Sequence, residues 1–135
     1  MYNIKMIGLD LDGTLLTSRK ELTENTKRVL KDAIDAGIQV LVATGRPFTG
    51  IPKELQEFPG IHYALTSNGA RVLNTDTGEL LIEQLLPLES AKKALHIFQK
   101  YDTLSEVYFD GQGYADQAKL DNVGRYHHDP NMWNY

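Results

Sequence analysis

Apolar residues gather in three short runs in the first half of the chain, and each run stops at small polar residues. The runs cover residues 4–9, 38–43 and 61–66. Near-continuous apolar runs of this length are typical of β-strands that are buried on both faces. We therefore expect three buried strands here.

The sequence between the first two runs has helical spacing. Four apolar residues fall on one helical face: Val29, Leu30, Ala33 and Ile34. Thr23 precedes this stretch as a candidate N-cap, and Gly37 follows it at the position of a C-terminal glycine. A shorter, weaker helix is expected within residues 50–57.

Strands that alternate with helices predict an α/β fold, with a Rossmann-like parallel sheet and right-handed crossovers. The pattern changes after residue 70. Two hairpins are expected, one joining residues 71–73 to 80–83 and one turning at residues 111–113, with a helix that opens at Pro87 between them. We therefore expect a partial α/β core over residues 1–86 and an incomplete α+β unit over residues 87–135.

Composition narrows the class of protein. The chain has 135 residues, of which 41% are hydrophobic and 24% charged, as in globular domains. The net charge of −4 gives no support for nucleic-acid binding, and no apolar run is long enough to span a membrane. Because the chain lacks cysteine and a signal-like start, we predict a cytoplasmic protein with neither nucleic acid nor membrane as partner.

Each predicted strand ends in residues that carry chemistry. The three segments are Asp-Leu-Asp-Gly-Thr at 10–14, Thr-Gly-Arg at 44–46 and Ser-Asn-Gly at 67–69. In open α/β sheets the ligand lies outside the carboxyl ends of the strands. We expect the three segments to line one crevice.

Asp10 and Asp12 pose an electrostatic problem. Residues two apart on a strand point the same way, and like charges at short range are costly unless something compensates them. A magnesium ion held by carboxylates would do so, and so would a shared proton that makes one carboxyl a general acid. A solvated surface turn is the ordinary reading of Asp-Gly, but this pair directly follows an apolar run.

These segments resemble a known family. DLDGTLL at 10–16 is similar to the first signature of the haloacid dehalogenase superfamily of phosphatases, and VATGR at 42–46 resembles the second. TSNGA at 66–70, followed by a hairpin into a new α+β unit, looks like the Cof-type branch, whose cap is inserted after the third strand.

The resemblance implies a site and a reaction. Asp10 would attack phosphorus and form an aspartyl-phosphate, and Asp12 would act as general acid and then general base. The Thr44 hydroxyl and the backbone N–H groups of Leu11 and Gly45 would bind the phosphoryl oxygens. Mg²⁺ would bind the Asp10 carboxylate and the Asp12 main-chain carbonyl.

Two further residues have more than one interpretation. Arg46 would grip phosphate or substrate, or form a structural ion pair. Asn68 would line the substrate pocket, or serve only the Asn-Gly turn. A metal site at His127, His128 and Asp129 is disfavoured, because adjacent histidines do not share a helix face.

The sequence also departs from the family pattern. Family members have a third signature, a lysine, and a fourth, an acidic pair, and no segment here matches either one. We therefore expect a truncated chain that has little activity alone. Its first strand would become a sheet edge, open to the missing C-terminal half or to self-association.

The leading functional hypothesis is a Mg²⁺-dependent phosphohydrolase for small phosphorylated metabolites, such as sugar phosphates. A phosphomutase, or a phosphatase for mannosyl- or sucrose-phosphate, is an alternative at the same site. A non-catalytic module of the same fold that binds phosphate, Mg²⁺ or a partner is another. A receiver domain is disfavoured because Ser67 and Asn68, not an acid, end the third strand.

Overall fold

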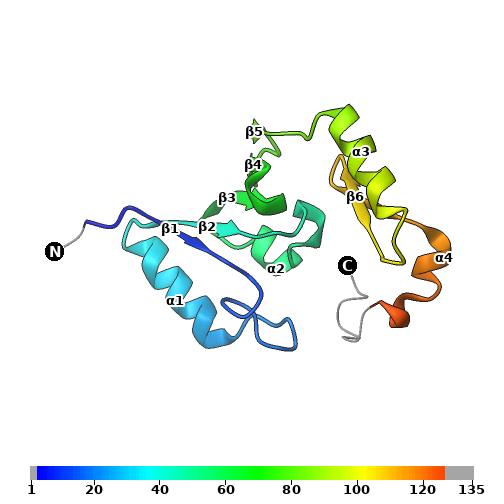
Figure 1. Ribbon diagram of the computed structural model, residues 1–135. Helices are drawn as coiled ribbons and strands as arrows, with labels where there is room; N and C mark the ends of the chain where they lie inside the picture. Colours follow the sequence, from blue (N-terminus) through cyan, green and yellow to red (C-terminus); the bar gives the residue numbers. More distant parts are fainter. Residues whose placement is uncertain (1–2, 127–135) are drawn as a thin grey trace. The chain divides into compact units, whose positions relative to one another are not determined.

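The computed structural model describes residues 3–126, which form two compact units divided between Gln84 and Leu85 (Figure 1). This division lies close to the boundary predicted between residues 86 and 87. That the two units serve as a hydrolase core and a cap stays a prediction. His127, His128 and Asp129 lie outside the described residues.

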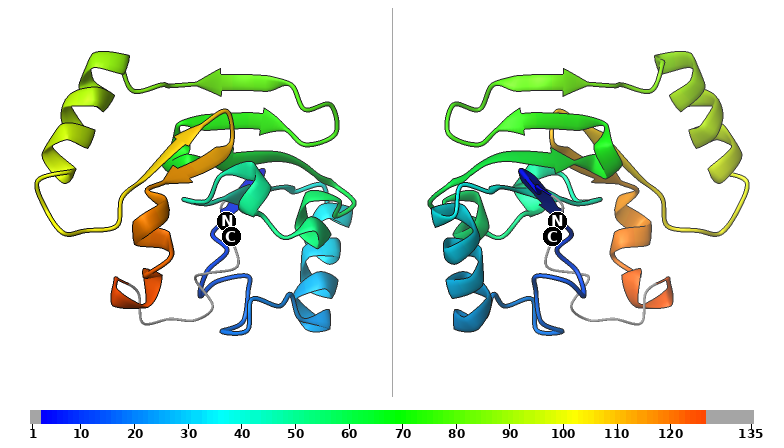
Figure 2. Two further views of the ribbon diagram at one scale, coloured as in Figure 1. Left: turned by 90° about the vertical axis from the view of Figure 1, so that its right-hand side faces the viewer. Right: turned by 90° about the vertical axis from the view of Figure 1, so that its left-hand side faces the viewer.

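One five-stranded sheet organises the first unit. Its strands are β1 (Met6–Leu9), β2 (Gln39–Ala43), β3 (Ile61–Thr66), β4 (Arg71–Asn74) and β5 (Leu80–Glu83), and they are ordered in space as in the sequence. The first three are parallel, whereas β4 runs antiparallel beside β3 and β5 antiparallel beside β4 (Figure 2). The predicted Rossmann-like α/β class is confirmed, with a sheet that is mixed because tight turns follow β3 and β4.

Helix α1 (Glu24–Asp35) connects β1 to β2 and begins and ends where the sequence predicts. The Thr23 hydroxyl accepts a hydrogen bond from the Thr26 N–H at 3.1 Å, which caps the first turn. Gly37 follows the helix at φ 79°, a left-handed conformation that glycine adopts without strain.

The connection from β2 to β3 differs from the single short helix expected there. It contains a 3-10 turn, η1 (Phe48–Gly50), and a one-turn helix, α2 (Lys53–Gln56). Pro52 separates them, since it holds the preceding Ile51 in an extended conformation at ψ 133°.

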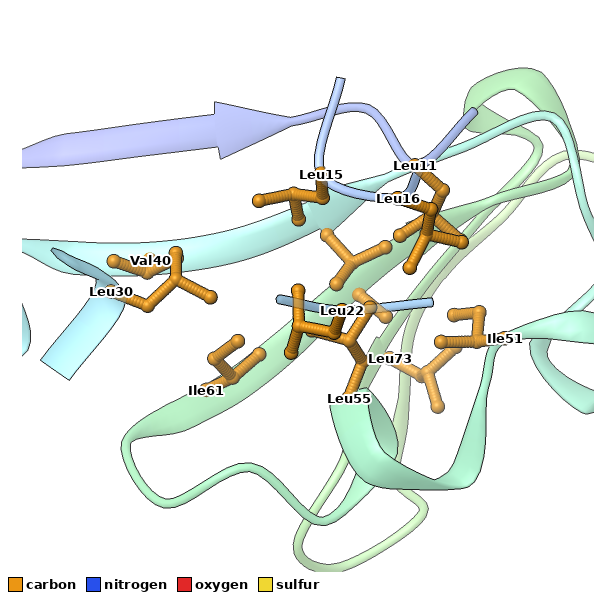
Figure 3. Close-up of a cluster of buried hydrophobic side chains, with 12 residues drawn as sticks. Leu11, Leu15, Leu16, Leu22, Leu30, Val40, Ile51, Leu55, Ile61 and Leu73 are labelled. Atoms are coloured by element: carbon orange, nitrogen blue, oxygen red, sulfur yellow. The ribbon is translucent and has the colours of Figure 1, made fainter. Parts of the chain in front are cut away.

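The hydrophobic core of this unit lies on the face of the sheet that α1 and α2 cover (Figure 1). Leu30 of α1 and Leu55 of α2 are buried in one cluster with strand residues such as Val40 (Figure 3). The twelve buried apolar side chains are Leu11, Leu15, Leu16, Leu22, Leu30, Val40, Val42, Ile51, Leu55, Ile61, Ala64 and Leu73.

The expectation that the first strand is buried on both faces is wrong. Residues of β1 alternate between exposed and half-buried, and Met6 is 56% exposed. Within residues 3–126 the strand is the last of its sheet, paired with β2 alone, as predicted for a chain without the later family segments. Its apolar sequence therefore does not mean that both of its faces are covered by helices.

The second unit contains α3 (Leu88–Phe98), β6 (Glu106–Phe109), β7 (Gln112–Ala115), α4 (Gln117–Leu120) and the 3-10 turn η3 (Val123–Arg125). The predicted hairpin is present, but its turn is not residues 111–113. Asp110 and Gly111 form it, with φ of 48° and 77°. Two left-handed residues suit the right-handed twist of a hairpin, so Gln112 and Gly113 remain in β7. No helix of the described chain is long and apolar enough to cross a membrane.

Candidate active site

Backbone hydrogen bonds join the loops that follow β2 and β3. The Asn68 N–H donates to the Thr44 carbonyl at 3.2 Å, and the Ser67 N–H donates to the Arg46 carbonyl at 2.9 Å. The Thr44 N–H in turn donates to the Leu65 carbonyl at 2.9 Å. Two of the three predicted segments are therefore held side by side.

The loop after β1 is anchored by a leucine between its two aspartates. Leu11 is fully buried, whereas Asp10 and Asp12 on either side of it are exposed. The Leu11 carbonyl accepts a hydrogen bond from the Leu16 N–H at 2.9 Å, and Gly13 turns the chain at φ 76°. Burial of the middle residue keeps both carboxylate-bearing residues at the surface of the sheet end.

Arg46 links this first loop to the other two. Its Nε donates to Asp12 Oδ2 at 2.9 Å and its Nη2 to Asp12 Oδ1 at 2.7 Å, a two-point carboxylate–guanidinium pair. Of the two interpretations that the sequence left open for Arg46, the structure contains the ion pair.

Asp12 has a second cationic partner that sequence reasoning missed. The Lys20 Nζ donates to Asp12 Oδ1 at 2.7 Å. The hydrogen bond from Arg46 is the largest cause of a lowered pKa for the Asp12 carboxyl; partial burial raises that pKa, and Lys20 lowers it further. Lys20 lies eight residues after Asp12, in a turn where its φ is 63°. The sequence indicated this contact only through two basic residues, Arg19 and Lys20, that follow the acidic pair.

Thr44 is buried at the end of β2, with 5% of its surface exposed. Its hydroxyl oxygen accepts a hydrogen bond from the Arg46 N–H at 3.2 Å. Because that bond uses the oxygen lone pair, the hydroxyl proton can be donated to a ligand. The geometry shows the loop-capping role of Thr44, and its phosphate-binding role stays a prediction.

Gly45 and Asn68 meet across the two joined loops. A Cβ atom at Gly45 would lie 2.8 Å from the side-chain oxygen of Asn68, so no larger residue fits without displacing the asparagine. Ser67 and Asn68 both have positive φ, 51° and 55°. The turn role of Asn68 is present in the structure, and its substrate-binding role stays a prediction.

The donor atoms available for a metal are few. Among residues 3–126, no three His, Cys, Asp or Glu side chains gather in a way that could hold an ion. The Asp10 carboxylate and the Asp12 main-chain oxygen remain as candidates, since the Asp12 carboxylate is engaged by two cations. Magnesium is commonly held by one or two carboxylates together with waters and substrate phosphate, so this partial set fits Mg²⁺ bound with phosphate.

Comparison with protein families matches residues 7–134 to the haloacid dehalogenase-like hydrolases. The HMP-PP phosphatase of Klebsiella pneumoniae is 33% identical over 117 residues, covering 85% of this chain and 42% of the relative. The 5-amino-6-(5-phospho-D-ribitylamino)uracil phosphatase YitU of Bacillus subtilis is 31% identical over 124 residues, covering 86% of this chain and 45% of the relative.

Solved structures give the same result. A haloacid dehalogenase-like hydrolase from B. subtilis superposes with a TM-score of 0.75 at 28% identity, over 88% of this chain and 42% of the solved one. The subclass IIB sugar phosphatase BT4131 of the same superfamily has a TM-score of 0.74 at 22% identity, over 92% of this chain and 49% of its own, and supports the fold alone.

The fold and the strand-end loops define an α/β protein of the haloacid dehalogenase type. The chain belongs to the haloacid dehalogenase-like hydrolases, and within them to the Cof-type branch, as the three sequence segments predicted. It spans less than half the length of the two curated phosphatases named above.

Proposed function

We propose that the whole protein is a Mg²⁺-dependent, cytoplasmic phosphohydrolase that removes phosphate from small phosphorylated metabolites. The observation that carries the proposal is the pair of exposed aspartates on either side of a buried leucine, tied by Arg46 to the Thr44 loop. The two curated relatives named above are phosphatases, one named for HMP-PP and the other for 5-amino-6-(5-phospho-D-ribitylamino)uracil, which supports this substrate class.

Asp10 is the proposed nucleophile. Its carboxylate oxygen forms a bond to phosphorus while the bond from phosphorus to the leaving oxygen breaks, which gives an aspartyl-phosphate. A water oxygen then attacks that phosphorus, inorganic phosphate leaves, and the Asp10 carboxylate is restored. The exposure of Asp10 at the strand end suits in-line approach by a substrate.

Asp12 is the proposed carrier of the proton. It protonates the leaving oxygen in the first step and takes a proton from the attacking water in the second. The pair with Arg46 favours the ionised carboxylate in the free protein. An anionic phosphoryl group beside Asp12 raises the pKa of its carboxyl, because like charges disfavour ionisation, and so helps the acid step.

Thr44, Gly45 and Leu11 are the proposed phosphate ligands, through one hydroxyl and two backbone N–H groups. Mg²⁺, when bound, would offset the negative charge of the phosphoryl group. Asp10 and the Asp12 main-chain oxygen would hold it.

The test measures phosphate release by the whole protein from a panel of sugar phosphates and other small phosphorylated metabolites, with and without Mg²⁺. We expect Asp10→Asn to abolish turnover and the acid-stable trapping of phosphate on the protein. Asp32→Asn is the matched control, because Asp32 is an exposed acid on α1 that pairs with Arg28 at 3.0 Å, away from the loops. Turnover that survives Asp10→Asn would contradict the nucleophile, and transfer of the phosphoryl group within the substrate instead of its release would favour a phosphomutase.

A further inference from the structure

Within the described chain, the hydrogen bonds of Arg46 reach all three strand-end loops of the candidate site. Its side chain holds Asp12 in the first loop, its N–H and the Thr44 hydroxyl are bonded within the second, and its carbonyl accepts from Ser67 in the third. Its Nη1 also donates to the Gly50 carbonyl of η1 at 2.8 Å.

We propose that Arg46 is a positioning residue that fixes the Asp12 carboxylate and locks the three loops into one site, and that it is not a ligand of the substrate phosphate. The proposal deepens the proposed function and rests on it for the role of Asp12 in proton transfer. It assigns Arg46 to one of the two roles that its sequence position allows.

The directions of the guanidinium bonds favour positioning. All three nitrogens are engaged by the protein, Nε and Nη2 by the two oxygens of Asp12 and Nη1 by the Gly50 carbonyl. The Arg46 side chain is only 12% exposed, whereas that of Asp12 is 38% exposed. To bind phosphate, the Arg46 guanidinium would have to turn away from the Asp12 carboxylate, which already matches it in geometry and charge.

The two basic side chains that contact Asp12 come from different parts of the chain. Lys20 donates to Asp12 Oδ1 from a turn of the same loop. Arg46 comes from the end of a different strand and contacts both oxygens, so it fixes the orientation of the carboxylate plane as well as its charge. Loss of Arg46 removes the hydrogen bonds that link the first loop to η1 and to the β2 end, whereas loss of Lys20 removes a bond within the first loop.

Orientation matters because proton transfer needs the carboxylate within hydrogen-bond reach of the leaving oxygen. Displacement of a catalytic group by about 1 Å costs on the order of 100-fold in rate. A planar, five-donor guanidinium holds three acceptors in fixed directions, which a lysine ammonium on a flexible stem does not do.

The test compares Arg46→Met, Arg46→Lys and Lys20→Met in the whole protein, with Arg28→Met on α1 as the matched control. We expect Arg46→Met to lower kcat by about 10- to 100-fold with KM within about threefold of the parent. Arg46→Lys is expected to fail to restore kcat, because charge alone does not supply the bridge. Lys20→Met is expected to lower kcat less, and Arg28→Met to leave both constants unchanged.

A raised KM with kcat retained in Arg46→Met, restored by Arg46→Lys, would identify Arg46 as a phosphate ligand and overturn the proposal. If Arg46→Met does not fold, the same decision rests on Arg46→Lys, which keeps the charge and stem: a parental kcat there overturns the proposal.

A second measurement does not depend on turnover. In ¹H–¹⁵N spectra of the 135-residue chain, we expect Arg46→Lys to shift amide signals of Gly13, Gly50 and Ser67, one in each segment it contacts. Lys20→Met is expected to shift only those of the first loop. Shifts confined to the second loop in Arg46→Lys would overturn the proposal, whereas a whole protein without phosphatase activity would overturn only the proposed function.

Discussion

At the scale of single residues, the site depends on how closely two loops approach each other. Gly45 and Asn68 lie so near that one methyl group between them cannot be accommodated in place. The backbone N–H of Gly45 is a proposed phosphate donor, so any shift of this loop moves a donor away from the phosphoryl oxygens.

We predict that Gly45→Ala lowers kcat/KM of the whole protein by about tenfold or more, since the added Cβ displaces the loop or the asparagine. The penalty should shrink in an Asn68→Ala background, where the obstructing oxygen is gone. Gly8→Ala is the control, because a Cβ there meets its nearest atom at an ordinary 3.5 Å. An equal penalty in both backgrounds would mean that the steric explanation is wrong.

Residue identities at the strand ends could be predicted from the sequence because they follow local rules. Asp10 and Thr44 come directly after an apolar run and Asn68 one residue further on, and the carboxyl ends of parallel strands share one edge. The partnership of Arg46 with Asp12 spans 34 residues and depends on side-chain direction, which no local pattern encodes. The contact of Lys20 with Asp12 is not predictable from the sequence for the same reason.

At the scale of elements, the sequence predicts the bounds of a helix or strand closely where a single local interaction determines them. Thr23 and Gly37 delimit α1 through cap chemistry, and β3 has the predicted bounds. The β6–β7 turn was misplaced because three candidate residues, two of them glycine, stood in a row, and the backbone twist selected Asp110 and Gly111. Burial of β1 was misjudged because an apolar run does not reveal what covers its second face.

A side-chain cluster in the second unit joins Asp102, in the segment after α3, to Arg125 of η3 and to Tyr126, which follows it. The Tyr126 hydroxyl donates to Asp102 Oδ1 at 2.7 Å, and Arg125 pairs with Oδ2 of the same carboxylate. The hydrogen bond with Tyr126 is the main cause of a pKa of Asp102 below its ordinary 3.8, and the same bond holds the pKa of Tyr126 above its ordinary 10.0.

We predict that this cluster stabilises the second unit at intermediate pH and that its contribution is lost in acid and in strong alkali. Asp102 has a lowered folded pKa, so its contribution is present above 3.8 and is lost as pH falls through the folded value. Tyr126 has a raised folded pKa, so its contribution is complete below 10.0 and is lost as pH rises through the folded value.

The measurement is denaturant unfolding of the 135-residue chain across pH, followed by signals of the second unit. Tyr126→Phe should remove the alkaline loss attributed to this cluster, while Tyr114→Phe on β7 is the matched control and should keep it. An unchanged alkaline limb in Tyr126→Phe would show that another group titrates there.

At the scale of the whole molecule, the described residues carry the segments that we propose as the first half of a phosphatase site. They include the aspartate pair and the Thr44 loop, but the 135-residue sequence contains no segment like the third and fourth family signatures. The predicted pairing of the free β1 edge with a further strand stays a prediction; concentration-dependent sedimentation of the chain would support it, and a monomer at all concentrations would contradict it.

We predict that the isolated 135-residue chain binds Mg²⁺ and a phosphate mimic such as vanadate, yet turns over phosphorylated substrates little. No segment of its sequence resembles the family signatures that would supply a lysine to offset the charge of the phosphorylated aspartate and the remaining acidic metal ligands. Calorimetry measures the binding, and phosphate release measures the turnover. Robust Mg²⁺-dependent turnover that disappears in Asp10→Asn would refute this prediction, and the absence of binding would argue against a preformed half-site.

The buried Leu11 between the two aspartates has a consequence for how such a protein can change over evolutionary time. Lifting that loop from the sheet means extracting a fully buried leucine from the core, which costs about 1.5–3 kcal/mol for the exposure of that side chain alone. Mutations that broaden or shift the range of substrates are thereby directed to other segments. The proposed reacting groups stay in place while those segments diverge, so one reaction can be applied to many metabolites.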